Sequence, residues 1–104
     1  MTAYAAIADA MTLYFDGLHH SDTARLAKVF HRHAHYVCAT DGELTHLAMD
    51  QYFRVVDRRT SPASRNKQRH DRIVTNEFAG PVTAFVRAEC AIGPKFFTDL
   101  LTFV

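Results

Sequence analysis

The segment HDRIVTNEFAGPVTAFVRAECAIGPKFFTDLLTFV, residues 70–104, decides the fold, because its hydrophobic residues recur at every second position over long stretches. Three strand-like runs are separated by Gly80-Pro81 and Gly93-Pro94, and such pairs mark tight turns. Strands joined by short turns pair with their sequence neighbours in antiparallel orientation. The segment therefore predicts a three-stranded antiparallel meander.

The middle run of this segment has two unlike faces, as expected of a strand whose side chains alternate. The face predicted to be buried consists of Val82, Ala84, Val86, Ala88, Cys90 and Ile92. The opposite face is more polar and consists of Thr83, Phe85, Arg87 and Glu89. We therefore expect a sheet with one side against a core and the other side toward solvent.

The residues near the N-terminus repeat with helical periodicity instead. The first run follows the i, i+3, i+4 rule of an amphipathic helix through Tyr4, Ile7, Ala8, Met11, Tyr14, Phe15 and Leu18. A second, short helix is expected after Ser21 or Asp22, either of which can cap its first turn. Its apolar face consists of Leu26, Val29 and Phe30.

A strand, a turn and a third helix are predicted to follow. The stretch AHYVCAT has the composition of a strand, and Asp41-Gly42 after it is a strong tight-turn signal. The third helix is expected from about Ala48 to Arg59, with Asp50 near its positive end. Its buried side consists of Tyr52, Phe53 and Val56.

The length of 104 residues predicts one domain, residues 1–104. Helices that precede a run of strands predict an α+β fold, here with three helices packed on one face of a curved, antiparallel sheet. The sequence stops at Val104 inside an apolar strand. We expect either that a further strand has been lost or that another chain covers the exposed edge.

Composition excludes several classes of protein. Lys and Arg number 12 and Asp and Glu number 11, so no global charge indicates a nucleic-acid or anionic-membrane partner. No apolar run reaches the roughly 20 residues of a membrane helix, and the N-terminus lacks the pattern of a signal peptide. Cys38 and Cys90 form no CxxC motif and are expected to be reduced, buried thiols in a cytoplasmic protein.

Asp99 is unusual in the last strand, because its neighbours at alternate positions are Phe97, Leu101 and Phe103. A carboxylate on an apolar face is costly to bury unless a partner satisfies it. Two interpretations stay open at this point. Asp99 either faces water or lies in a pocket, where it has a partner and a role.

Histidines are concentrated in HRHAH, which places His31, His33 and His35 at alternating positions. Three imidazoles on one strand face would suit a metal ion. We favour the interpretation without a metal, because a helix is expected to end near Phe30 and imidazoles suit the negative end of a helix. Of the seven histidines, His35 is expected nearest the pocket mouth.

Basic residues cluster from the third helix through the loop after it. They are Arg54, Arg58, Arg59, Arg65, Lys67, Arg69 and Arg72. Nucleic-acid binding would need aromatic platforms or a helix suited to a groove, and neither is evident. We interpret the cluster as a solvated basic rim, which could still attract an anionic ligand.

The order of elements resembles the nuclear transport factor 2-like superfamily, which includes ketosteroid isomerases and SnoaL-type polyketide cyclases. The residues that carry the resemblance follow the pattern Y-x7-D…F-x3-A and are Tyr14, Asp22, Phe30 and Ala34. Residues 70–104 look closest to the branch called putative lumazine-binding proteins. The resemblance implies a cone-shaped half-barrel, with a strongly bent sheet and helices around a pocket. Members usually have a dG-x-W turn and one more strand, so the last strand is expected to be missing.

The resemblance also assigns a role to Asp99. In ketosteroid isomerases a first-helix tyrosine and a late-strand carboxylic acid donate hydrogen bonds to a substrate oxyanion. Tyr14 and Asp99 fall at the corresponding places. The general-base carboxylate of the isomerases has no counterpart, because Cys38 takes its position and a thiol among apolar residues is a poor base. A pocket with a polar corner is therefore expected, and isomerisation by the family mechanism is disfavoured.

The sequence accordingly predicts a protein that binds a small, flat, mostly apolar or heteroaromatic molecule, with no metal and no cofactor. The expected pocket residues are Tyr14, Leu18, Cys38, Tyr52, Phe53, Val56, Val86, Cys90, Phe97, Asp99 and Leu101. The first alternative is a SnoaL-like cyclase, isomerase or dehydratase in which Asp99 is the acid or base and Tyr14 stabilises an enolate. The second alternative is a non-catalytic dimerisation scaffold.

A homodimer is expected through the outer face of the sheet, where superfamily members commonly associate. Phe85 lies on that face beside Arg87 and Glu89, as an aromatic anchor in a polar interface would. The alternative is that Phe85 is one of the single exposed apolar residues that most proteins carry.

Overall fold

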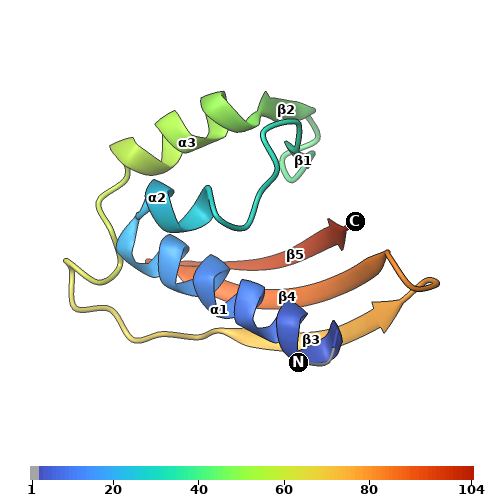
Figure 1. The fold of residues 1–104 in the computed structure, drawn as a ribbon. Coiled ribbons are helices and arrows are strands. Elements are labelled where there is room, and N and C mark those ends of the chain that lie inside the picture. The colour runs from blue at the N-terminus through green and yellow to red at the C-terminus, as the bar shows by residue number, and fades with distance from the viewer. Residues whose placement is uncertain (1–2) are drawn as a thin grey trace.

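The computed structural model describes residues 3–104 and has the predicted α+β architecture. Figure 1 shows the three helices on one side of a long meander. In chain order the elements are α1 (Ala3–His20), α2 (Thr23–Leu26), β1 (His35–Cys38), β2 (Thr45–Ala48), α3 (Met49–Arg58), β3 (Arg72–Phe78), β4 (Ala84–Ile92) and β5 (Lys95–Phe103).

The meander predicted from the alternating segment is confirmed. β4 pairs antiparallel with β3 on one side and with β5 on the other. Gly80 and Gly93, in the two turns, have φ angles of 76° and 62°, which favour glycine because they lie in the left-handed region. In this register Val86 lies opposite Leu101, and Ala88 lies opposite Asp99.

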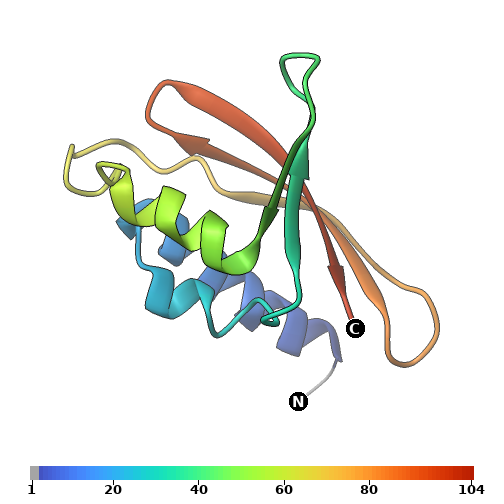
Figure 2. The ribbon, with the colours of Figure 1, turned by 90° about the horizontal axis from the view of Figure 1, so that it is seen from above.

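The β1–β2 hairpin forms a second sheet, separate from the meander. Figure 2 shows the hairpin crossing above the meander. The Asp41-Gly42 turn lies in its loop, where Gly42 has a φ angle of 85°. β2 was not expected, because its four residues, THLA, carry little strand signal. The sheet is therefore divided in two, and the cone is open rather than closed.

The core lies between α1 and the meander and continues under α3. Its α1 side chains are Met11, Tyr14, Phe15 and Leu18, and its β4 side chains are Val86, Ala88 and Cys90. Three residues predicted for these apolar faces are exposed. One of them is Ala8 on α1. Tyr4 is 57% exposed in the first turns of α1, with its ring edge against Phe78, and Val82 is 75% exposed because it precedes the first β4 residue.

α1 and α2 meet closely at Gly17. A β-carbon at this position would lie 2.7 Å from Leu26 Cδ2, and Leu26 is completely buried. Asp22 caps α2, as predicted, by accepting a hydrogen bond from the Arg25 backbone N–H at 3.2 Å. None of the helices within residues 3–104 combines the length and hydropathy that a membrane span requires.

Candidate functional site

Asp99 turns toward the helices. It lies opposite Ala88, whose side chain is buried, and its Oδ2 accepts a hydrogen bond from the Tyr14 hydroxyl at 2.6 Å. The Cys90 thiol donates to the same oxygen at 3.4 Å. The second carboxylate oxygen, Oδ1, makes no hydrogen bond to residues 3–104, so it can accept one from a bound molecule. Of the two orientations left open by the sequence, the inward one is observed.

Two adjoining hollows share a wall at this polar pair. The shared wall consists of Tyr14, Tyr36, Cys38, Tyr52, Phe97 and Asp99. The first hollow, here called the Phe30 lobe, has a volume of about 240 Å³ and adds Phe30, His35, Val37, Thr40, Met49, Thr98, Leu100 and Leu101. The second, here called the Arg59 lobe, has a volume of about 280 Å³ and adds Thr45, Leu47, Val55, Arg59 and Ile92.

Aromatic rings give the lobes flat walls. Tyr36 on β1 and Tyr52 on α3 are stacked, with ring centroids 4.7 Å apart and planes 10° apart. Phe30 lies edge-on to Tyr14 at 5.7 Å and to Tyr52 at 6.4 Å. A planar molecule can contact such walls over much of its area, because offset and edge-to-face arrangements of rings are favourable.

Six of the predicted pocket residues line the lobes, and the other five do not. The six are Tyr14, Cys38, Tyr52, Phe97, Asp99 and Leu101. The other five, which are Leu18, Phe53, Val56, Val86 and Cys90, line neither lobe. Four of these five are buried beneath the lobes, Cys90 directly against Asp99, and Phe53 packs against the core as a partly buried residue. Inward-facing positions on the elements therefore supply both core and pocket.

The sequence analysis missed several lining residues, above all Tyr36 and Arg59. Tyr36 could have been found, because it shares a face of β1 with Cys38 at alternate spacing. Arg59 could not, since it lies at the end of α3, where the direction of a long side chain is not fixed by periodicity.

Burial and charge raise the pKa values of the tyrosines in this wall. Burial, and then the nearby Asp99 carboxylate, raise the pKa of Tyr14 well above its usual value. Burial, and then a hydrogen bond with Cys38, raise the pKa of Tyr36 to about 12. These phenols stay protonated at neutral pH and act as hydrogen-bond donors.

The two cysteines differ in their surroundings. Cys38 was expected among apolar groups, but a hydrogen bond from Tyr36 lowers the pKa of its thiol, and Thr40 and Thr45 add smaller effects in the same direction. Burial, and then the Asp99 charge, raise the pKa of Cys90. Both cysteines are free thiols. Cys38 is therefore the thiol that can react with a molecule in the lobes.

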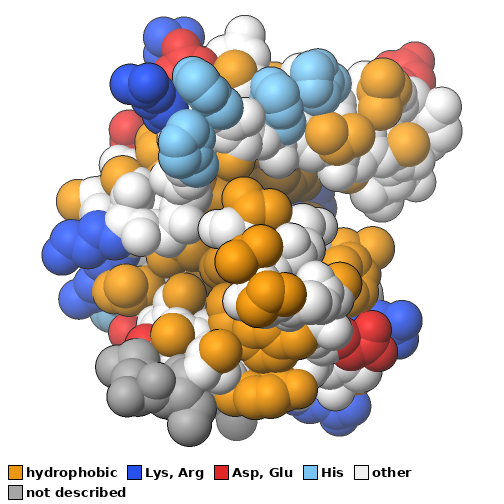
Figure 3. Space-filling view, turned by 45° about the vertical axis from the view of Figure 1, so that its right-hand side comes forward, with side chains coloured by type: hydrophobic (Ala, Val, Ile, Leu, Met, Phe, Trp, Pro, Cys, Tyr) orange, Lys and Arg blue, Asp and Glu red, His pale blue; other side chains and the backbone are white. Residues whose placement is uncertain are grey.

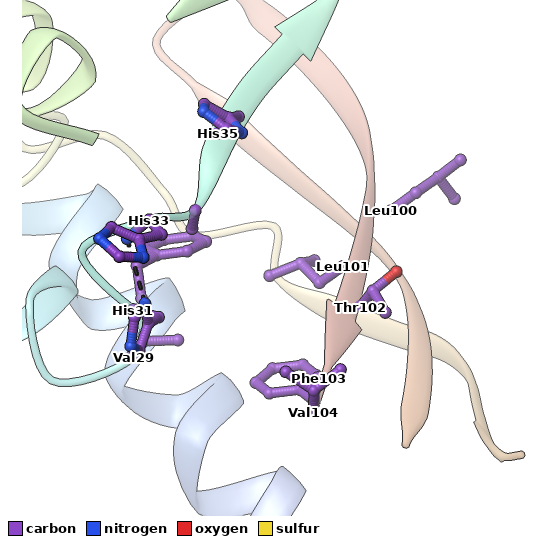
Figure 4. Close-up of a pocket in the computed structure, with 11 residues that line it drawn as sticks. Val29, His31, His33, His35, Leu100, Leu101, Thr102, Phe103 and Val104 are labelled. Atoms are coloured by element: carbon purple, nitrogen blue, oxygen red, sulfur yellow. Dashed lines mark hydrogen bonds between the residues drawn. The ribbon is translucent and has the colours of Figure 1, made fainter. Parts of the chain in front are cut away.

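A third hollow, of about 520 Å³, lies between the end of β5 and the segment that joins α2 to β1. Figure 4 shows Leu101 and Phe103 pointing across it while Leu100 points away. Figure 3 shows hydrophobic side chains gathered on this side of the molecule below several histidines. The edges of β1 and β5 that border this hollow and the Phe30 lobe form no strand pairing within residues 3–104.

His31, His33 and His35 all border the third hollow, but their rings belong to two different pairs. The rings of His31 and His33 are 5.1 Å apart, and the backbone N–H of His33 donates to His31 Nδ1 at 3.1 Å. His35 instead lies near His46, across the β1–β2 hairpin, and lines the Phe30 lobe. Within residues 3–104 no three His, Cys, Asp or Glu side chains are grouped as metal ligands would be.

Comparison with known protein families identifies the family of this chain. The family described as "Putative lumazine-binding" matches residues 2–104. The chain belongs to this family. No curated protein sequence matches it significantly.

As a member of this family, the protein shares its fold with solved structures of two bacterial proteins. One is an NTF2-like protein of unknown function from Shewanella baltica OS155, with a TM-score of 0.84 and 22% identity over 98% of this chain and 83% of that one. The other is an NTF2-like protein of unknown function from Silicibacter pomeroyi DSS-3, with a TM-score of 0.77 and 22% identity over 98% of this chain and 85% of that one. The nuclear transport factor 2-like fold predicted from the sequence is thus confirmed.

Proposed function

We propose that the protein binds a small, flat, mostly apolar or heteroaromatic molecule in the Phe30 and Arg59 lobes. The observation that carries the proposal is the 2.6 Å hydrogen bond between Tyr14 and Asp99, made in a wall shared by two hollows. Pockets that combine apolar walls with a few convergent polar groups are typical ligand sites.

The proposed arrangement leaves one acceptor for the ligand. Tyr14 and Cys90 both donate to Asp99 Oδ2, so Oδ1 can accept a hydrogen bond from an N–H or O–H group of the ligand. The stacked rings of Tyr36 and Tyr52 provide apolar area beside it. Lobes of about 240 and 280 Å³ suit a molecule of one or two fused rings. The family description names such a heteroaromatic ligand, lumazine.

Titration calorimetry with lumazine as the probe tests the proposal. We expect saturable binding to the unaltered protein and at least about tenfold weaker binding to Asp99→Asn, because a charge-assisted hydrogen bond contributes about 1.5–3 kcal/mol. Asp50→Asn, which changes an exposed carboxylate on α3, is the matched control and should bind normally. Absence of lumazine binding to the unaltered protein, or equal binding to Asp99→Asn and Asp50→Asn, would contradict the proposal.

An enzymatic function is the alternative. In it Asp99 exchanges a proton with the substrate and Tyr14 stabilises an enolate. Two observations support this alternative: the direct contact between Tyr14 and Asp99, and the lowered pKa of the Cys38 thiol in the same wall. Turnover of an enolisable ketone that is abolished in Asp99→Asn would support an enzyme. Binding without turnover would support the binding protein.

The outer face of the meander is the proposed dimer interface. Leu100, which is 64% exposed, lies opposite Arg87 on this face, and Phe85 lies beside them on β4. Light scattering after size exclusion should give a dimer that Phe85→Asp converts to monomer, because Phe85 lies on this face and lines neither lobe. A monomer at every concentration would contradict this interface, and with it the scaffold alternative.

A further inference from the structure

Arg59 directly follows the last residue of α3 as its C-cap, and its side chain lines the Arg59 lobe. Its Nη2 is buried, and no acceptor from residues 3–104 reaches it. Arg25, Arg54 and Arg69, by contrast, each have a carboxylate within 3.5 Å. A guanidinium offers five N–H donors, and leaving a buried charged donor without an acceptor is costly. An acceptor from outside the chain would compensate it.

The positive charge of Arg59 lies close enough to the shared wall to affect the pKa of Tyr52. Burial raises the pKa of Tyr52, but the positive charge of the nearby Arg59 guanidinium opposes this shift. Asp99, in the same lobe, forms no ion pair with Arg59 and instead accepts from Tyr14 and Cys90. The lobe therefore has a positive group and a negative group that do not neutralise each other directly.

The surroundings of Arg59 are positive on the outer side as well. A neighbouring hollow of about 350 Å³ is lined by Arg59 together with Arg65 and Lys95, and its lining contains no Asp or Glu. Ile92 and Phe97 border both this hollow and the Arg59 lobe. Clefts lined by charge of one sign raise the local concentration of ligands of the opposite sign.

We propose that the pocket selects planar acids, and that the ligand places an anionic oxygen on the Arg59 guanidinium and a donor group on Asp99. This inference rests on the proposed function and specifies its ligand class. The ring system of the ligand lies against the Tyr36 and Tyr52 stack, since these rings line the same lobe as Arg59 and Asp99. Arginine suits the acid because its planar fork matches a carboxylate with two parallel hydrogen bonds.

Calorimetry with two isosteric probes tests the inference. Indole-2-carboxylate has a planar ring, an N–H donor and a negative charge. Indole-2-carboxamide has the same ring and N–H donor but carries an uncharged NH2 group in place of one carboxylate oxygen. We expect the protein to bind the carboxylate at least about tenfold more tightly than the amide. Arg59→Met should abolish this preference, and Arg59→Lys should retain part of it, because lysine keeps the charge but not the fork.

Arg58→Met is the matched control, because Arg58 is the exposed neighbour of Arg59 in the last turn of α3. It should keep the full preference for the carboxylate. Circular dichroism checks that each variant is folded, and the comparison of the two probes on the unaltered protein needs no variant.

The outcomes separate the inference from the proposed function. Equal binding of the two probes to the unaltered protein, or a preference that survives in Arg59→Met, would overturn the inference and leave the proposed function standing. If neither these probes nor lumazine binds, the proposed function fails and the inference fails with it.

Discussion

Replacing Tyr14 by Phe removes one hydroxyl from the centre of the site and keeps the ring. The lost hydrogen bond is short, at 2.6 Å, and its acceptor is a carboxylate, so it belongs to the stronger class, worth about 1.5–3 kcal/mol. Asp99 keeps the Cys90 thiol as a weaker donor at 3.4 Å. We therefore expect Tyr14→Phe to lower the free energy of unfolding by about 2 kcal/mol at pH 7.

The pH dependence of this loss is a sharper test. Burial and Asp99 raise the pKa of Tyr14 above its unfolded value near 10, so the folded state keeps a proton that the unfolded state loses at high pH. The stabilisation is therefore complete below pH 10 and is lost as pH rises through the folded pKa. The difference between the unaltered protein and Tyr14→Phe should shrink by about 1.4 kcal/mol per pH unit above pH 10.

Urea unfolding followed by circular dichroism, from pH 7 to pH 11, measures both quantities. Tyr4→Phe is the control, because Tyr4 lies on the same helix but is 57% exposed. It should change stability by less than about 0.5 kcal/mol throughout. A Tyr14→Phe difference near zero at pH 7, or one that stays constant up to pH 11, would refute the account of this hydrogen bond.

Three further predictions concern packing and thiol chemistry. Iodoacetamide at pH 7.5 should modify Cys38 at least about tenfold faster than Cys90, as followed by mass spectrometry. The reason is that the pKa of Cys38 is lowered, whereas Cys90 is buried and its pKa is raised. Equal rates of modification would contradict this prediction. Gly17→Ala should lower the free energy of unfolding in urea by about 1–3 kcal/mol, although alanine has the better helix propensity, because the added Cβ would lie 2.7 Å from Leu26 Cδ2. An unchanged unfolding midpoint would disprove this close packing. Asp22→Ala should cost about 1 kcal/mol in the same assay through loss of the α2 cap, whereas no loss would show that the cap is dispensable.

The alternating segment predicted the meander well, because period-2 patterning and Gly-Pro turns are local signals. Alternation placed Phe97, Asp99 and Leu101 on one face of the last strand, but the sequence left open whether Asp99 faces water or a pocket. The contact between Tyr14 and Asp99 joins residues 85 positions apart, and it was anticipated only through a resemblance in the order of elements.

The division between core and pocket was not predictable in the same way. Val86 and Leu101 are cross-strand neighbours on the inner face, yet Leu101 lines a lobe and Val86 is fully covered. Which residues α1 covers depends on how the sheet curves, and periodicity does not encode curvature. The separate β1–β2 sheet escaped prediction for a related reason, because a four-residue strand such as Thr45–Ala48 carries too little pattern.

Nuclear magnetic resonance of the ¹⁵N-labelled protein, titrated with lumazine, tests the central claim most directly. The account predicts saturable shifts of the amide signals of Tyr36, Cys38 and Asp99, which belong to the shared wall. Signals of the β3–β4 turn around Gly80, which lies outside both lobes, should not move. Saturable shifts confined to other parts of the chain, or none at all, would contradict the claim that the lobes at Tyr14 and Asp99 form a ligand site.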